Sequence, residues 1–329
     1  MVQALITGVN SQDGSYLADF LLKKDYYVIG TVRSKNPKWP DGFNPNRSEL
    51  EIVQCDLGFS NSISNLFSEL GNIEELYNLA AQSHVGYSFE HPEETYRITG
   101  IGASMLMDAY FKNYPNGHFY QASSSEMYGN QNSISVSGYD KFDWFNPVSP
   151  YGVAKTMAHF AANMHREMGH FVCDGILFNH ESERRHESFV TQKICKKAVE
   201  IANWLESGKK GDMAELLLGN LYAERDWGYA PEYVEVMWKM MQEKTPRIYV
   251  IGTGVAHSVQ WFVERVFEYL ELDWTKYVDS GYECFSRPKD INRLCANPRD
   301  LNNLLGRTPT QAEELVRIMV NHQLEIQKC

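Results

Sequence analysis

The sequence predicts an α/β fold, in which a doubly wound parallel (Rossmann-type) sheet is followed by a smaller C-terminal substrate-binding lobe. Short apolar runs alternate with longer helical patterns through the first half, which is typical of a parallel sheet covered by helices on both faces. A turn with two glycines follows the first apolar run, as in nucleotide-binding folds. We expect strands at residues 2–7, 26–32, 51–54, 75–80, 118–122 and 171–178, and helices near residues 15–24, 102–111 and 151–168.

The alternation becomes irregular near Asn179, which suggests where the second lobe begins. We expect residues 1–178 to form mainly the nucleotide-binding domain. Residues 179–329 would form mainly the substrate lobe, with some segments returning to the sheet. The proline-bearing stretch 36–48 is predicted to be a surface loop.

Composition and charge exclude several classes of protein. Hydrophobic residues make up 43% of the chain and charged residues 22%, which are ordinary values for a globular protein. A net charge of -11 argues against nucleic-acid binding, which depends on clustered Lys and Arg. The cysteines form no C-x-x-C pair, so we expect reduced thiols and no metal site; they are Cys55, Cys173, Cys195, Cys284, Cys295 and Cys329.

The N-terminal residues predict the cellular location. The chain starts with a strand-like apolar run and lacks the basic region, long apolar stretch and cleavage site of a signal peptide. No apolar span is long enough for a membrane helix. We therefore expect a cytoplasmic protein with no membrane partner.

The turn after the first predicted strand is where nucleotide-binding folds place their phosphate loop. Glycines there permit tight turning and close approach of backbone N–H groups to a pyrophosphate. The spacing corresponds to G-x-x-G-x-x-G with serine at the middle position, so the motif alone is weak. The expected cofactor contacts in this turn are Gly8, Asn10, Ser11, Gln12, Asp13 and Gly14.

Residues at the ends of the next strands add to this cofactor site, because ligands bind at the carboxyl ends of parallel strands. Arg33 occupies the place where an acidic residue would hold the ribose 2′-hydroxyl of NAD. A guanidinium pairs instead with the 2′-phosphate of NADP, so NADP is favoured; an exposed loop arginine is an equal alternative. The other expected contacts are Asp56, Leu57, Leu79, Ala80 and Ala81.

The strongest local pattern is Tyr151-x-x-x-Lys155, preceded by a strand end that contains Ser124. Residues four apart share one helix face, and a nearby ammonium stabilises a phenolate. We therefore expect Lys155 to lower the pKa of Tyr151 from about 10 toward working pH. The tyrosine would take a proton from a substrate hydroxyl as hydride leaves for nicotinamide, and Ser124 would orient that hydroxyl.

Glu126 distinguishes dehydration from simple alcohol oxidation. Oxidising C-4 of a hexose acidifies the C-5 proton, which a carboxylate can remove as water leaves from C-6. A second hydride transfer, to C-6, would regenerate the oxidised cofactor. The alternative is a solvated or helix-capping glutamate, but Glu126 directly follows the proposed site at Ser124 and Ser125.

Longer segments extend these motifs into a resemblance over nearly the full chain. They are ALITG at 4–8, QDGSYL at 12–17, AQSHV at 81–85, SPYGVAK at 149–155, GILFNHES at 175–182, FVT at 189–191, GNL at 219–221 and RDWG at 225–228. Through them the sequence resembles the GDP-mannose 4,6-dehydratase family of extended short-chain dehydrogenases/reductases. The resemblance implies bound NADP, a GDP-hexose substrate, and a catalytic hydroxyl, base, tyrosine and lysine at Ser124, Glu126, Tyr151 and Lys155.

The resemblance also implies where the nucleotide sugar binds. Asn179, Lys193, Arg225 and Arg287 correspond to positions at which the family holds this substrate, and arginine forks suit its diphosphate or ribose oxygens. The full set of expected substrate contacts is Ser83, His84, Ser125, Glu126, Asn179, Arg185, Lys193, Gly219, Arg225, Arg287 and Asp290.

Several positions depart from the family pattern. Ser11 replaces glycine, Ser124 replaces threonine, and Ser34 replaces the second arginine of a pair near the cofactor and the family's tetramer interface. Near the substrate site, Glu183 replaces proline, His186 glycine, Gln192 arginine and Asp290 glutamate. A related GDP-sugar such as a GDP-manno-heptose is therefore an alternative substrate, since one pocket residue changes discrimination by only about 1–3 kcal/mol.

Two further alternatives stay open at this point. A reductase or epimerase acting on a GDP-4-keto-sugar would share Tyr151 and Lys155 but would not need Glu126. A binding protein that has lost turnover would retain the fold, and Ser11 and the altered pocket motivate this idea. The complete catalytic set favours the dehydratase, which we expect to be a homo-oligomer, either a dimer or a tetramer.

Overall fold

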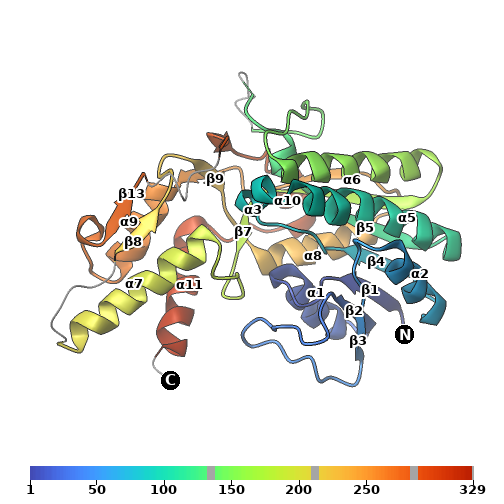
Figure 1. Cartoon of the computed structure of the whole chain (residues 1–329), viewed down its shortest axis with the longest axis horizontal. Coiled ribbons are helices and arrows are strands. Elements are labelled where there is room, and N and C mark those ends of the chain that lie inside the picture. Colours follow the sequence, from blue (N-terminus) through green and yellow to red (C-terminus); the bar gives the residue numbers. More distant parts are fainter. Residues whose placement is uncertain (132–137, 209–214, 282–287, 328–329) are drawn as a thin grey trace.

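The computed structural model describes residues 1–131, 138–208, 215–281 and 288–327. Its centre is a sheet of seven parallel strands in the order β3-β2-β1-β4-β5-β6-β11, so the predicted doubly wound parallel sheet is confirmed (Figure 1). These strands are β1 (Gln3–Thr7), β2 (Tyr27–Val32), β3 (Leu50–Gln54), β4 (Glu75–Asn78), β5 (His118–Ser124), β6 (Phe171–Leu177) and β11 (Ile248–Ile251).

Helices cover both faces of this sheet. Contacts join α1 (Gln12–Leu22), α8 (Ala230–Met241) and α10 (Arg299–Leu305) on one face, and α2 (Ser60–Glu69), α5 (Gly102–Asn113) and α6 (Pro150–Glu167) on the other (Figure 1). Side chains alternate across each strand, so Ala4 and Ile6 pack under the first layer while Leu5 packs under the second. Both faces of the sheet are therefore buried from solvent, as expected for parallel strands rich in Val, Ile and Leu.

Short helical pieces connect the strands at the carboxyl edge of the sheet. After β4 come α3 (Val85–Glu90), α4 (Pro92–Thr95) and the π-helical turn η1 (Tyr96–Ile101), which runs into α5. After β5 comes a single 3-10 turn, η2 (Ser125–Met127). These connections lie where a parallel sheet binds its ligands.

The second part of the molecule packs α7 (Val190–Glu206), α9 (Val259–Tyr269) and α11 (Ala312–Ile326) against one another (Figure 1). Its own core is buried among these helices, with Phe262, Phe267 and Leu315 fully covered. Short pairs of strands complete it: β8 (Leu216–Leu218) with β13 (Val278–Ser280), and β9 (Glu224–Asp226) with β12 (Ala256–Ser258) and β14 (Arg293–Leu294). The 3-10 turn η3 (Trp274–Lys276) precedes β13.

The chain crosses between the two parts more than once. β7 (His180–Glu181) pairs in parallel with β10 (Gly228–Tyr229), and α8, β11 and α10 then belong to the main sheet and its helix layer. The boundary at residue 178 stays a prediction. In the part of the chain that the structure describes, no helix combines the length and apolarity needed to span a membrane.

Most element ends lie within one or two residues of the sequence prediction, and two of the differences have a clear cause. α1 begins at Gln12, three residues early, because the Ser11 hydroxyl caps it. β4 ends at Asn78, before the expected residue 80, because the backbone N–H groups of Leu79 and Ala80 both donate to Thr7 Oγ at 3.0 Å. In each case a hydroxyl side chain, of Ser11 or of Thr7, replaces a backbone partner.

Candidate active site

Glycine is required at two positions, one in the turn between β1 and α1 and one in the first turn of α1. Gly8 has a φ of +72°, and a Cβ there would lie 3.1 Å from the Cα of Ala80. A Cβ on Gly14 would lie 2.3 Å from the carbonyl oxygen of Gly8, so no side chain fits. Ser11 has a φ of -88°, and its Oγ accepts a hydrogen bond from the Gly14 N–H at 3.1 Å. The serine therefore caps the helix, and its backbone does not adopt the left-handed conformation that would require glycine.

A single cleft of about 2300 Å³ runs from this turn into the second part of the molecule. Nearly all the residues predicted for the cofactor and the substrate line it. Gly14 is the exception, since it packs beneath the turn, and Arg287 lies outside the described residues. The cleft is lined by Gly8, Asn10, Ser11, Gln12, Asp13, Arg33, Asp56, Leu57, Leu79, Ala80, Ala81, Ser83, His84, Ser124, Ser125, Glu126, Tyr151, Lys155, Asn179, Arg185, Lys193, Gly219, Arg225 and Asp290.

The cofactor half of the cleft fits a dinucleotide. Gly8 lines the cleft with main-chain atoms, and a Cβ there would press against Ala80. The turn leads into the N-terminus of α1, and helix N-termini favour phosphate. The side chain of Arg33 is 67% exposed, and its Nη1 lies 3.4 Å from Glu94 Oε1. Such exposed ion pairs are weak, at about 0–1 kcal/mol, so Arg33 can exchange this partner for a phosphate.

The start of α6 sets the positions of two predicted catalytic residues. Ser149 Oγ accepts from the Gly152 N–H at 3.0 Å and Pro150 is the first helical residue, so Tyr151 lies in the first turn. Lys155 follows one turn later and is 5% exposed. Its Nζ donates to the carbonyl oxygen of Ala122 at 2.7 Å and lies 5.8 Å from the centre of the Tyr151 ring.

Burial dominates the ionisation of this pair. It raises the pKa of Tyr151 to about 12, although a hydrogen bond with Ser124 acts in the opposite direction. It lowers the pKa of Lys155 to about 8, against the attraction of Asp174 and Asp13. The predicted lowering of the tyrosine pKa was therefore wrong, because desolvation of the phenolate outweighs the favourable contacts.

Glu126 lies beside this pair because of the turn that follows β5. Its N–H donates to Ser124 Oγ at 3.2 Å, which starts the turn η2. A Cβ on Gly152 would lie 2.8 Å from the Glu126 carbonyl oxygen, so glycine allows the start of α6 to approach this turn closely. Glu126 is 8% exposed, and its charge acts to raise the pKa of Tyr151. Ser124, Glu126 and Tyr151 thus meet in one buried corner of the cleft.

The substrate half of the cleft contains cations fixed by main-chain oxygens. Arg225, on β9, donates from Nη1 to the Ile291 carbonyl at 2.8 Å, and its Nη2 lies 3.2 Å from Asp290 Oδ1. Lys193, on α7, donates from Nζ to the Leu217 carbonyl at 2.7 Å. The structure therefore brings Arg225 and Asp290 together, and it anchors Lys193 across the same half of the cleft.

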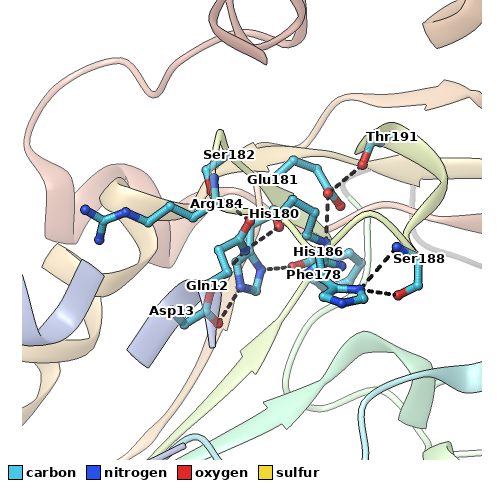
Figure 2. Close-up of polar contacts among 11 residues, drawn as sticks. Gln12, Asp13, Phe178, His180, Glu181, Ser182, Arg184, His186, Ser188 and Thr191 are labelled. Carbon is cyan, nitrogen blue, oxygen red and sulfur yellow. Dashed lines mark hydrogen bonds and ion pairs between the residues drawn. The ribbon is translucent and has the colours of Figure 1, made fainter. Parts of the chain in front are cut away.

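Arg185 is held between β7 and α7. Its Nε lies 3.0 Å from Glu181 Oε2, and its guanidinium carbon lies 3.6 Å from the centre of the Phe189 ring. Thr191 Oγ1 donates to the same Glu181 oxygen at 2.6 Å, as Figure 2 shows. The Asn179 carbonyl accepts from the Gly228 N–H at 2.9 Å, which sets the start of this segment.

Sequence reasoning missed a second cluster on the cleft wall. Glu183 accepts hydrogen bonds from the hydroxyls of Tyr16, at 2.9 Å, and Tyr229, at 3.3 Å. Arg184 pairs with Asp19 at 2.7 Å and lies over the Tyr16 ring. No local pattern signals these contacts, because Tyr16 on α1 lies 167 residues before Glu183 and Tyr229 lies 46 residues after it. Among the described residues, no group of three or more His, Cys, Asp or Glu could hold a metal ion.

The strand order and the cleft at the carboxyl edge define a doubly wound parallel fold of the Rossmann type. A dTDP-glucose 4,6-dehydratase from Streptomyces venezuelae, solved with NAD and TYD, superposes with a TM-score of 0.83 at 19% identity, covering 99% of this chain and 98% of that one. A UDP-glucose 4-epimerase from Thermotoga maritima, solved with UDP-glucose, gives a TM-score of 0.83 at 20% identity, covering 99% and 100%. These likenesses establish the fold.

Sequence comparison identifies the family. The family profile described as GDP-mannose 4,6 dehydratase matches residues 5–319. GDP-mannose 4,6 dehydratase 2 of Arabidopsis thaliana is 39% identical over 99% of this chain and 87% of its own length. The GDP-mannose 4,6-dehydratase of Vibrio cholerae is 42% identical over 98% and 93%. The chain belongs to the GDP-mannose 4,6-dehydratase family and is an enzyme of the dehydratase (hydro-lyase) class that uses a nicotinamide cofactor.

Proposed function

We propose that this enzyme converts GDP-mannose to GDP-4-keto-6-deoxymannose with tightly bound NADP. The observation that carries the proposal is the position of Glu126, buried in the cleft beside Ser124 and Tyr151. A dehydration at C-5 and C-6 needs such a carboxylate, and a simple oxidation at C-4 does not. The names of the relatives supply GDP-mannose as the substrate.

In the proposed mechanism, this chain's residues move the protons. Tyr151, hydrogen-bonded to Ser124, takes the proton of the C-4 hydroxyl. A Lys155 ammonium, 5.8 Å from the tyrosine ring, would favour the phenolate. The cofactor, when bound, would supply the acceptor for the C-4 hydride and the source of the hydride at C-6. Between these transfers Glu126 removes the C-5 proton while the C-6 hydroxyl leaves as water. The C-5 carbon finally regains a proton, so the product is lighter than the substrate by one water.

Arg33 supports NADP over NAD in this proposal. It lines the cofactor half of the cleft beyond β2, where it meets the adenosine ribose in folds of this kind. Its exposed side chain makes a long contact to Glu94, at 3.4 Å. A guanidinium there would form charge-assisted hydrogen bonds with a 2′-phosphate.

We also propose that the enzyme forms a homo-oligomer through the outer face of α6. Val153, Met157, Phe160, Met164 and Met168 recur every three or four residues and are all at least 43% exposed. Exposed apolar stripes of this kind mark interaction sites on soluble proteins. A second copy would bury them. The stripe accounts for one interface, which a dimer and a tetramer would share.

The cytoplasmic location stays a prediction.

GDP-manno-heptose is the second candidate substrate. The favouring observation is that Glu183, His186 and Gln192, all departures from the family pattern, line the same cleft. A reductase or epimerase of a GDP-4-keto-sugar is less well supported, because neither has a use for Glu126. A non-catalytic binding protein would have no use for the corner formed by Ser124, Glu126 and Tyr151.

The test is to incubate the purified enzyme with GDP-mannose and a catalytic amount of NADP and to follow the sugar nucleotide by mass spectrometry. We expect a product 18 Da lighter in wild type, by the mass of one water, with no net reduction of NADP. Glu126→Gln should abolish it, whereas Glu268→Gln, on the exposed face of α9, should not. Turnover of a GDP-manno-heptose without turnover of GDP-mannose would show that the heptose is the substrate. No product from either sugar would contradict the dehydratase proposal.

A further inference from the structure

A polar bridge joins the start of α1, which carries the phosphate turn, to β7 in the substrate segment. Gln12 donates from Nε2 to the His180 carbonyl at 3.1 Å and accepts at Oε1 from Ser182 Oγ at 2.8 Å. Asp13 Oδ2 lies 2.8 Å from His180 Nε2 (Figure 2). Two consecutive residues of the cofactor turn therefore contact residues that directly follow Asn179.

The surroundings of His180 fix its protonation state. Its Nε2 faces the Asp13 carboxylate, and its Nδ1 lies 2.7 Å from the main-chain oxygen of Phe178. The Phe178 carbonyl only accepts hydrogen bonds, and so does an ionised Asp13 carboxyl. Burial raises the pKa of Asp13, but the charge and hydrogen bond of His180, a hydrogen bond from Gln12 and the charge of Arg185 outweigh it, so the pKa is lowered. Both ring nitrogens must then carry hydrogens, which makes His180 an imidazolium. The ring is 11% exposed and stacks on Tyr233 at 4.5 Å between centroids.

The ionisable groups around the ring are consistent with this state. Burial lowers the pKa of His180, but the charge and hydrogen bond of Asp13 outweigh it and raise the pKa above its usual value. Arg185, in the loop after β7, acts weakly in the opposite direction. Tyr233, on α8, keeps its proton because burial raises its pKa well above 10. Asp13 is thus the acidic group in contact with the ring.

The charge of Asp13 has a consequence for the cofactor. This carboxylate lines the cleft in the turn where a dinucleotide diphosphate binds, and like charges at such a site repel. The His180 imidazolium neutralises it at 2.8 Å. A neutral imidazole has one N–H, which cannot serve Asp13 and the Phe178 carbonyl together. Loss of the proton from His180 would therefore leave the Asp13 charge without its counter-charge and would break one of the two hydrogen bonds that the ring donates.

We propose that His180 is a protonated positioning residue for the cofactor: its imidazolium neutralises Asp13 beside the phosphate turn and ties that turn to the substrate segment at Asn179. The inference rests on the proposed function, because it takes a nicotinamide dinucleotide as the ligand. NADP affinity then depends on the charge of His180, and it falls as the pH rises through the pKa of this residue.

The experiment measures the dissociation constant of NADP by calorimetry for wild type, His180→Gln, Asp13→Asn and the double variant. Glutamine keeps one donor but removes the charge, so we expect His180→Gln to bind NADP at least tenfold more weakly. The double variant, which also lacks the carboxylate, should bind more tightly than His180→Gln. His118→Gln, at the opposite end of β5 and bonded to a main-chain oxygen at 3.0 Å, is the matched control and should bind as wild type.

A second series compares the pH dependence of NADP binding in wild type and His180→Gln. Between pH 7 and 9 a 2′-phosphate stays ionised, so a decline in wild-type affinity across this range reports on the protein. We expect a steeper decline in wild type than in His180→Gln, in which the Lys155 ammonium still titrates at about pH 8 in the same cleft. Equal affinity and equal pH dependence of the two proteins would overturn the inference. So would a double variant whose loss of NADP binding free energy equals the sum of the losses in His180→Gln and Asp13→Asn. If wild type bound no NADP, the proposed cofactor would fail, and this inference with it.

Discussion

Lys155 donates from Nζ to the main-chain oxygen of Ala122 at 2.7 Å, which ties the helix carrying Tyr151 to the strand that ends at Ser124. The contact holds the lysine next to its tyrosine and uses one of its three N–H donors. The catalytic corner is therefore rigid: α6, β5 and the turn η2 fix its three oxygen-bearing side chains relative to one another.

The pH dependence of turnover should report on Lys155. Burial lowers its pKa to about 8, so the ammonium is present below that pH and is lost above it. We expect kcat/KM to fall as the pH rises through about 8. Lys155→Arg keeps a charge at every pH, so this variant should be slower but should lack the alkaline decline. An unchanged alkaline decline in Lys155→Arg would show that another group titrates.

Cofactor preference should depend on Arg33. Replacing it with aspartate removes the partner of the 2′-phosphate and adds a repelling charge. We expect Arg33→Asp to weaken NADP binding at least tenfold, since charge-assisted hydrogen bonds contribute about 1.5–3 kcal/mol, and to leave NAD binding unchanged or improved. Parallel titrations with both cofactors measure this. Arg317→Asp, exposed on α11, is the control; equal losses for NAD and NADP would contradict the assignment.

Gly14 should be intolerant of any side chain. A Cβ at this position would lie 2.3 Å from the Gly8 carbonyl oxygen, so Gly14→Ala must move the phosphate turn. We expect a loss of about 1–3 kcal/mol in the free energy of unfolding, the usual cost of overpacking. Urea denaturation measures it. Gly71→Ala is the control, because its Cβ would meet nothing closer than 4.0 Å, and matching losses in the two variants would refute the steric argument.

Assembly should depend on the outer face of α6. Phe160 and Met164 are 57% and 51% exposed at the centre of the apolar stripe. A glutamate in the middle of a buried interface is costly, so Phe160→Glu should dissociate the oligomer into monomers. Light scattering after size-exclusion chromatography gives the mass directly. Tyr222→Glu, at an aromatic residue that is 81% exposed and lies between β8 and β9, should leave the mass unchanged. A wild-type monomer would refute the proposed interface.

The features predicted from the sequence are those that depend on residues close together in the chain. Six of the seven strands, the phosphate turn and the helix carrying Tyr151 and Lys155 each depend on residues within one short stretch. The strand β11 was not predicted, because nothing in its four residues says that they pair with β6 about 75 residues earlier. Local pattern specifies an element, and its neighbours are set by packing.

The parts of the site that sequence could not give depend on distance and burial. The hydrogen bond from Ser182 to Gln12 joins residues 170 positions apart. The pKa of Tyr151 was predicted to fall next to a lysine, but the helix start is buried against η2 and desolvation raises it instead. Spacing identifies which side chains share a face, and it carries no information on how dry that face becomes.

The most direct test of the central claim, an internal oxidation and reduction with Glu126 as the base at C-5, is to run the reaction of unlabelled GDP-mannose in heavy water. We predict a product that has lost one water and carries one solvent deuterium, bound at C-5, with only protium at C-6. Because the hydride returns from the substrate's own C-4, solvent does not label C-6. Deuterium at C-6, or none at C-5, would contradict this mechanism.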